Sequence, residues 1–144
     1  MAEHRIASKT VLLYIDPAGG TAYNTVVCLT EITRSDTRTT TDASSFCGPN
    51  KALGPLEVGE RNFTGFHLMD PNTGSISGAN LRTLLYSGAT IGYKIGPATP
   101  VTGDETEVGT AFIGSLSDTY ALDTDATFQG GIQPYGTPVF TITV

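Results

Sequence analysis

The sequence predicts a mainly β domain, a β-sandwich or barrel-like sheet flanked by one short α-helix. The first reason is composition, because only 15% of the 144 residues are charged, against roughly 25% in an average globular protein. Thr, which favours strands, and Gly, which favours turns and bulges, take the place of the missing charge. The second reason is the alternation of apolar and polar residues in segments such as 108–117, and the third is that a helical period occurs in one place only. A chain of this length fits a single domain, residues 1–144.

The strands follow from apolar runs and from the turns that close them. Val11-Leu-Leu-Tyr-Ile15 is closed by Asp16-Pro-Ala-Gly-Gly20, which is typical of a buried strand followed by a turn. The last strand has no polar tail, so we expect it to pair within the subunit or with a neighbour. The expected strands are 11–15, 23–33, 60–69, 90–95, 108–116, 126–132 and 139–144.

Two segments lack the pattern of a core element. Residues 1–9 form a polar N-terminal arm without the apolar run of a signal peptide. Residues 34–54 are rich in Thr, Ser, Gly and Pro, and Phe46 is their main large apolar residue. A stretch of this length without a helical period predicts a protruding hairpin or a functional loop. Its portion 38–41 can pair as an exposed strand.

The helix is expected at residues 77–87. Ser77 can cap its N-terminus, and Leu81, Leu84 and Leu85 follow at i, i+3 and i+4 on one face. Gly88 supplies the stop, since glycine readily adopts the left-handed conformation at a helix C-terminus.

The net charge of −6 at pH 7 is unevenly distributed. From residue 96 to the end of the sequence there is no Lys or Arg, whereas the preceding part is balanced. An acidic β-surface of this kind repels the phosphates of nucleic acid. The acids of this region are Asp104, Glu105, Glu107, Asp118, Asp123 and Asp125.

The chain offers little catalytic chemistry. Its two histidines, His4 and His67, are isolated, and a lone His in a strand is usually structural. Gly74-Ser-Ile-Ser-Gly78 resembles a nucleophile elbow only superficially, because Ile76 stands where the nucleophile would be. No Gly-rich phosphate loop is present, and the eight basic residues are scattered. We therefore expect no enzyme activity, no cofactor and no specific nucleic-acid recognition.

Metal and membrane sites are also not expected. Asp123-Thr-Asp125 could begin a calcium loop, but Phe128 stands where a Gly is needed, and a turn explains these residues more simply. Cys28 and Cys47 have no second thiol or imidazole nearby, which argues against zinc; we expect reduced thiols, with a disulfide left open. No apolar run approaches the roughly 18 residues that span a bilayer, so we expect no membrane insertion.

Three segments, taken in order and spacing, resemble the major tail tube protein of long-tailed, siphovirus-like bacteriophages. Residues 84–95 are similar to the family's helix and the strand that follows it. Residues 102–117 are similar to its Gly-Asp turn and alternating strand, and residues 125–131 with Gly136 to its penultimate strand. The resemblance covers residues 8–144. The segment with Phe46, Cys47 and Pro49 departs from it, because the family usually has polar residues there.

This resemblance implies a structural virion protein whose β-sandwich subunits form hexameric rings. The rings stack into a hollow tail tube through which DNA passes during ejection without specific binding. It also implies assembly in the host bacterial cytoplasm, a place in the virion tail, and a tape measure protein, a tail terminator and a distal tail protein as partners. A ring of six subunits would carry 6 × −6, about −36 charges, if every group were ionised.

Site residues follow from combining the resemblance with the charge pattern. Glu105, Glu107 and Asp123 are the candidate lumen-facing acids, with solvated turn charges as the alternative explanation. The arm and the 34–54 segment are the candidate bridges between rings, and Arg38, Phe46 and Lys51 are the candidate inter-ring contacts.

A second hypothesis is a monomeric β-sandwich that binds carbohydrate or decorates a particle surface. It predicts clustered exposed aromatics, but the chain has no Trp and its six tyrosines are dispersed. These tyrosines are Tyr14, Tyr23, Tyr86, Tyr93, Tyr120 and Tyr135.

Overall fold

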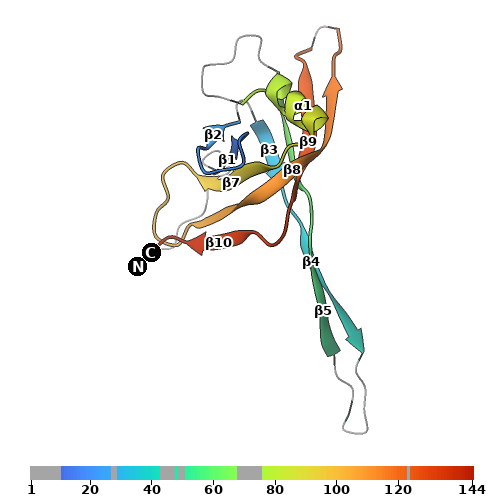
Figure 1. Cartoon of the computed structure of the whole chain (residues 1–144), viewed down its shortest axis with the longest axis vertical. Coiled ribbons are helices and arrows are strands. Elements are labelled where there is room, and N and C mark those ends of the chain that lie inside the picture. The colour runs from blue at the N-terminus through green and yellow to red at the C-terminus, as the bar shows by residue number, and fades with distance from the viewer. Residues whose placement is uncertain (1–10, 27–28, 43–47, 49–50, 68–75, 123) are drawn as a thin grey trace.

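A computed structural model describes residues 11–26, 29–42, 48, 51–67, 76–122 and 124–144. Antiparallel strands dominate these residues, and one short helix accompanies them (Figure 1), which confirms the predicted mainly β class. The elements are β1 Val11–Asp16, β2 Asn24–Thr25, β3 Leu29–Thr33, β4 Asp36–Asp42, β5 Lys51–Val58, β6 Arg61–Phe66, α1 Gly78–Ser87, β7 Ile91–Pro97, β8 Glu105–Thr119, β9 Thr127–Pro134 and β10 Val139–Ile142.

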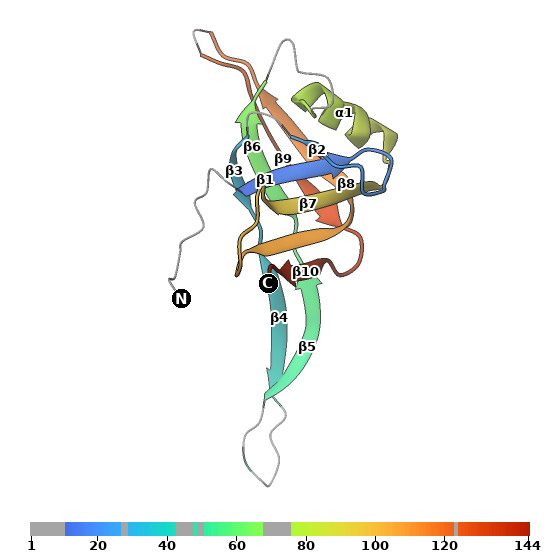
Figure 2. The same ribbon diagram turned by 90° about the vertical axis from the view of Figure 1, so that its left-hand side faces the viewer.

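The main sheet has the strand order β2-β1-β7-β8-β9-β6-β3, and β10 pairs with β8 outside this path. The 15-residue β8 joins two layers. Its first half pairs with β7, from Glu107 to Ala111, and its second half pairs with β9, from Ala111 to Thr119. A register shift between Ile113 and Ser115 marks a β-bulge, which bends and twists a strand. The layer of β1 and β7 therefore crosses the layer of β6 and β9 (Figure 2), as a sandwich or partly closed barrel requires.

The core lies between these layers. β7 is buried along nearly its whole length, with Ile91 and Tyr93 fully inaccessible. From the other layer, Phe63 and Phe128 meet edge to face with ring centroids 6.1 Å apart, a favourable geometry for aromatic pairs. The other buried apolar residues are Leu13, Ile15, Val26, Ile76, Leu81, Leu84, Ile95, Ala111, Ile113 and Ile132.

Helix α1 closes one end of this core and has the caps that the sequence predicts. The N-cap is Ser77, whose backbone N–H donates to the side-chain oxygen of Asn80 at 3.0 Å. Gly88 is the C-cap at φ 66°, in the left-handed region. Leu81 and Leu84 are buried against the sheet. The ten-residue helix is too short to cross a membrane, and it is the one helix of the described residues.

Strands β4 and β5 form a separate two-stranded sheet that projects from the body (Figures 1 and 2). This confirms the hairpin alternative for the 34–54 segment, including strand pairing at residues 38–41. The hairpin continues to Val58, beyond the predicted end. The sequence pattern missed this part because Gly54-Pro55 interrupts the alternation, at the register shift opposite Thr39.

Some expectations change or fall elsewhere. The single strand predicted at 23–33 is two elements, because β2 pairs with β1 whereas β3 pairs with β6 on the far edge of the sheet. The last strand, β10, pairs with β8 inside the subunit. The N-terminal arm, Phe46, Asp123 and the two cysteines lie outside the described residues.

Candidate functional site

The hairpin is held by a cluster of charged residues where it joins the body, here called the root cluster: Arg34, Asp36, Arg61, Tyr93 and Glu107. Arg61 opens β6 and is 1% exposed, and Glu107 in β8 is fully buried. The guanidinium of Arg61 donates to Glu107 through Nε at 2.8 Å and Nη2 at 3.1 Å. It also donates to Asp36 through Nη1 at 2.6 Å and Nη2 at 3.0 Å. One arginine thus binds two carboxylates in the paired geometry that suits its planar fork.

Glu107 has two further donors in the root cluster. Nη1 of Arg34 lies 2.6 Å from its Oε1, and the hydroxyl of Tyr93 donates to its Oε2. The other terminal nitrogen of Arg34 binds Glu105 at 2.7 Å. Among the described residues, no buried side-chain nitrogen or oxygen lacks a hydrogen-bond partner. The cluster therefore satisfies its buried charges, which is the condition for such charges to be tolerated in a core.

The electrostatics agree with this geometry. Burial alone would raise the pKa of Glu107, but hydrogen bonds from Arg61, Tyr93 and Arg34 outweigh it and hold the pKa below its ordinary value. The hydrogen bonds from Arg61 likewise lower the pKa of Asp36 against the opposing effect of burial. Burial and the neighbouring Glu107 raise the pKa of Tyr93. Both carboxylates are therefore ionised and Tyr93 is neutral at pH 7.

The root cluster fixes both legs of the hairpin. Asp36 opens β4, and its Oδ1 also accepts the backbone N–H of Gly59 at 3.2 Å. Arg61 donates to the carbonyl of Gly59 at 2.9 Å, and Gln133 of β9 donates to the carbonyl of Val58 at 3.0 Å. The legs pass so closely that a Cβ at residue 59 would lie 1.9 Å from the carbonyl oxygen of Ser35. Only glycine fits where the two legs come this close. Together with the hydrogen bonds of the root cluster, this close approach determines the direction of the hairpin within the subunit.

The hairpin carries two of the predicted inter-ring residues. Arg38 lies on β4, where its Nη1 donates to the carbonyl of Gly54 at 3.0 Å, and Lys51 opens β5. Arg38 pairs with Leu56 and Thr40 with Leu53, so the bulge between them places both leucines on the face of Arg38. Leu53 is 75% exposed and Leu56 41%. These leucines were missed by sequence reasoning; the available signal was two large apolar residues beside a Gly-Pro pair.

The predicted lumen acids differ in their surroundings. Glu107 is fully buried in the root cluster and presents no charge at the surface, contrary both to the lumen-facing position predicted for it and to the alternative of a solvated turn charge. Glu105 is partly exposed and paired with Arg34. The guanidinium of Arg34 also lies 5.4 Å from the ring centroid of Phe140, so the root cluster reaches β10. Glu105 thus stays a candidate, and Asp123 lies outside the described residues.

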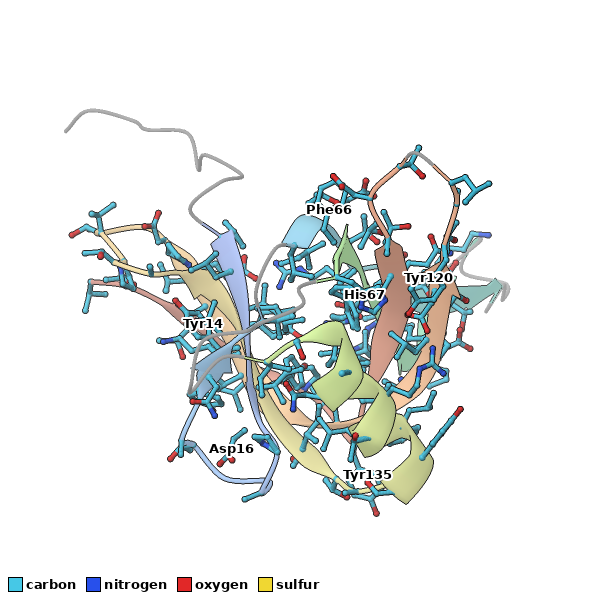
Figure 3. All side chains as sticks on the ribbon, turned by 90° about the horizontal axis from the view of Figure 1, so that it is seen from above. Tyr14, Asp16, Phe66, His67, Tyr120 and Tyr135 are labelled. Atoms are coloured by element: carbon cyan, nitrogen blue, oxygen red, sulfur yellow. The ribbon has the colours of Figure 1, made fainter. Side chains whose placement is uncertain are left out.

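A second cluster, here called the helix cluster, lies toward the end of the molecule opposite the hairpin (Figures 1 and 3). It consists of His67, Arg82, Asp118 and Tyr120. Asp118 of β8 binds Nε2 of His67 at 2.7 Å and also pairs with Arg82 of α1. The Tyr120 ring stacks on His67 at 5.6 Å, yet it is 73% exposed. This cluster ties α1 to β8 and presents an aromatic ring at the surface.

The described residues show no catalytic array. No three His, Cys, Asp or Glu side chains among them gather as a metal site requires. Of the buried acids, Glu107 is bound by arginines, whereas the carboxylates of Asp16 and Asp104 accept backbone N–H groups of their own turns. The fold therefore defines a class of β-rich subunits in which a projecting hairpin is held at its base by buried ion pairs.

Comparison with known proteins makes this class specific. A chain from the tail of an empty gene transfer agent particle with C6 symmetry superposes with a TM-score of 0.72 at 19% identity, over 95% of this chain and 99% of that one. The SPP1 tail tube gives a TM-score of 0.71 at 10% identity, over 97% and 81%. The cap that terminates the tube of the anti-feeding prophage gives 0.71 at 11%, over 99% and 95%. No family model and no curated protein matches the sequence. At these identities the likeness shows the fold, and it confirms the resemblance to tail tube proteins at that level.

Proposed function

We propose that this protein is a structural virion protein whose copies form hexameric rings, which stack into the hollow tail tube that DNA passes through. The observation that carries this proposal is the likeness in fold, along nearly the whole chain, to a tail with C6 symmetry and to a tail tube. The projecting hairpin supports it, because a head-to-tail contact between copies needs a protrusion on one side and a receiving surface on the other. This is a structural and not an enzymatic role.

The hairpin is the proposed bridge between rings. Eight residues of β5 extend about 26 Å at the rise of a β-strand, and they point away from their own subunit (Figure 1). The face of Arg38, Leu53 and Leu56 offers apolar area and a cation, a suitable combination for an interface. Lys51 and Phe46 stay part of this proposal. The leucines are the better anchors, since exposed apolar side chains gain most from burial in a contact.

The remaining parts of the proposal come from the resemblance to tail tube proteins. Assembly takes place in the host bacterial cytoplasm, the product lies in the virion tail, and a tape measure protein, a tail terminator and a distal tail protein are its partners. Glu105 and Asp123 are the candidate acids near the lumen once Glu107 is assigned to the root cluster.

Negative-stain electron microscopy of the purified protein at rising concentration tests this function. We expect rings or hollow tubes with a six-fold end view. The matched variants are Leu53→Ser with Leu56→Ser, which should leave rings but shorten or abolish stacks, and Tyr135→Ser, an equally exposed change outside the hairpin, which should not. A particle that stays monomeric at every salt and protein concentration, and binds a specific glycan, would favour the binding-module hypothesis instead.

A further inference from the structure

One face of the sheet is exposed along four strands and has an unusual composition. Along β6, Arg61, Phe63 and Gly65 are buried, so the alternate residues Asn62 and Thr64 point outward. The ladders extend this face across the sheet, because Thr64 lies beside Glu31 of β3 and Gln129 of β9, and Gln129 lies beside Ser117 of β8. We call this surface the polar face, and its outward residues include Glu31, Asn62, Thr64, Ser115, Ser117 and Gln129.

The polar face is hollowed. A shallow pocket opens between Asn62, Thr64, Ser115, Ser117 and Gln129. Gly130 contributes to the hollow because it carries no side chain. Gly131, which pairs with both Asn62 and Ser115, leaves room for the carboxylate of Glu60, whose Oε1 would lie 2.5 Å from a Cβ at residue 131. Hydroxyl and amide side chains predominate in the lining, which also includes Phe63 and Gly130. These polar groups bind water and carry no net charge.

No cation lies on the polar face among the described residues. Arg34, Arg38, Lys51 and Arg61 belong to the hairpin and its root. Arg82 lies on α1, and Lys94 of β7 lies over the ring of Tyr14 in the other layer. The face itself carries the carboxylate of Glu31, and Glu60 adds another at its margin, where it accepts a 3.3 Å hydrogen bond from Ser115. Two exposed phenylalanines border the face, since Phe66 continues the outward positions of β6 and Phe112 pairs with Gln133 beyond the bulge of β8.

We propose that the polar face is the wall that double-stranded DNA meets in the assembled tube, an inference that rests on the proposed function. Each lysine or arginine that contacts a phosphate adds affinity by releasing counterions, so a surface for sliding must have none. Apolar side chains at such a wall would stay exposed to water and gain nothing from burial. Hydrated hydroxyl and amide groups neither bind the DNA phosphates as a cation does nor repel them as a carboxylate does. Glu105 lies on the half of β8 that pairs with β10, outside this face, so this inference and the lumen position proposed for Glu105 are alternatives. The DNA-facing residues are thus uncharged side chains with a sparse row of carboxylates.

Cysteine labelling of assembled tubes separates the two lumen assignments. In a background with Cys28→Ser and Cys47→Ser, Gln129→Cys should react with a small maleimide, which diffuses in from the open ends, and resist a bulky polymer-linked maleimide. As dissociated subunits it should react with both. Tyr86→Cys is the control, since α1 lies on the opposite side of β9: a Cβ at residue 78 would sit 3.2 Å from the ring of Phe128. It should react with the bulky reagent in both states.

The outcomes are decisive in either direction. A Gln129→Cys tube that reacts with the bulky reagent, or with neither reagent, overturns the inference, as does the protected pattern appearing at Glu105→Cys instead. If tubes form but show the wrong labelling pattern, this inference is wrong and the proposed function still stands. If neither rings nor tubes form, the proposed function is contradicted as well.

A charge substitution gives a functional readout. Gln129→Lys adds one cation per subunit to the polar face, and Tyr86→Lys adds the same charge outside it. We expect Gln129→Lys tubes to retain short duplex DNA more than tenfold better than the control, with a salt dependence steeper by about 0.9 in log–log slope per phosphate contacted. Equal retention by the two variants contradicts the assignment.

Discussion

The root cluster and the helix cluster use the same kinds of side chain at opposite ends of the molecule, but in different surroundings. In the root cluster Arg61 and Glu107 are 1% and 0% exposed, and each carboxylate is held by several donors. In the helix cluster Arg82 is 36% exposed and His67 20%, so water competes for the same charges. Buried pairs cannot lose one partner without stranding the other, whereas exposed pairs contribute little. The root cluster is therefore required for the stability of the subunit, whereas the helix cluster contributes little and can be changed at small cost.

The largest effect should come from Arg61→Met. This change leaves Asp36 without its main partner and Glu107 with fewer donors, so we expect a loss of about 3–5 kcal/mol in the free energy of unfolding. Denaturant unfolding measures it. Arg38→Met, which removes an exposed arginine of the hairpin, is the matched control and should change stability by less than about 0.5 kcal/mol. Similar losses for the two variants would contradict the assigned role of the root cluster.

Acid should weaken the root cluster next. Glu107 and Asp36 have pKa values lowered by folding from ordinary values of 4.5 and 3.8. Their contribution to stability is therefore fully present above those ordinary values and is lost as pH falls through the lowered ones. We expect the free energy of unfolding to fall steeply below about pH 4, and Glu107→Gln to flatten that dependence while lowering stability at pH 7. A pH profile unchanged by Glu107→Gln would show that this carboxylate is not responsible.

A smaller effect is expected from Tyr93→Phe. It removes one donor to a buried carboxylate while the aromatic ring stays in the core, which should cost about 2 kcal/mol because hydrogen bonds to charged groups are the stronger ones. Thermal and denaturant unfolding measure it, with Tyr135→Phe at an exposed position as the control. No loss beyond the control would mean that the arginines alone satisfy Glu107.

The smallest effect should come from Asp118→Asn in the helix cluster. The amide keeps the shape of the carboxylate, and the lost ion pairs are partly exposed, so we expect less than about 1 kcal/mol. Hydrogen exchange of α1 gives a local readout, with modestly faster exchange expected in the helix and none in β6. A loss as large as that of Arg61→Met would erase the contrast between the clusters.

The sequence was sufficient for features that depend on near neighbours. Ser77 and Gly88 mark the helix ends because capping is local chemistry, and the Asp16 turn closes β1 for the same reason. Apolar alternation located β8, and the apolar residues between turn signals located β7 and β9. The Thr, Ser, Gly and Pro content of 34–54 and its lack of a helical period were enough to indicate a protruding hairpin or a functional loop.

The rest depends on contacts between distant residues. Glu107 appears in the sequence as one acid in an acidic segment, and nothing near it shows that Arg34, Arg61 and Tyr93 converge on it. Burial of a charge is decided by strand pairing, so a surface acid and a core acid have the same local pattern. The split of 23–33 into β2 and β3 also depends on pairing partners. The polar face could be recognised only once the ladders placed Thr64, Gln129 and Ser117 side by side.

The position of the root cluster, at the base of the hairpin, has an evolutionary consequence. Because the angle of the hairpin is fixed by residues at its base, substitutions along its outer length leave the folding of the body largely untouched. The projection can then drift, lengthen or be exchanged between relatives as a cassette, while the body keeps its shape. The fold is shared at identities of 10–19% with a tail and a tail tube, so it tolerates the replacement of most of its residues.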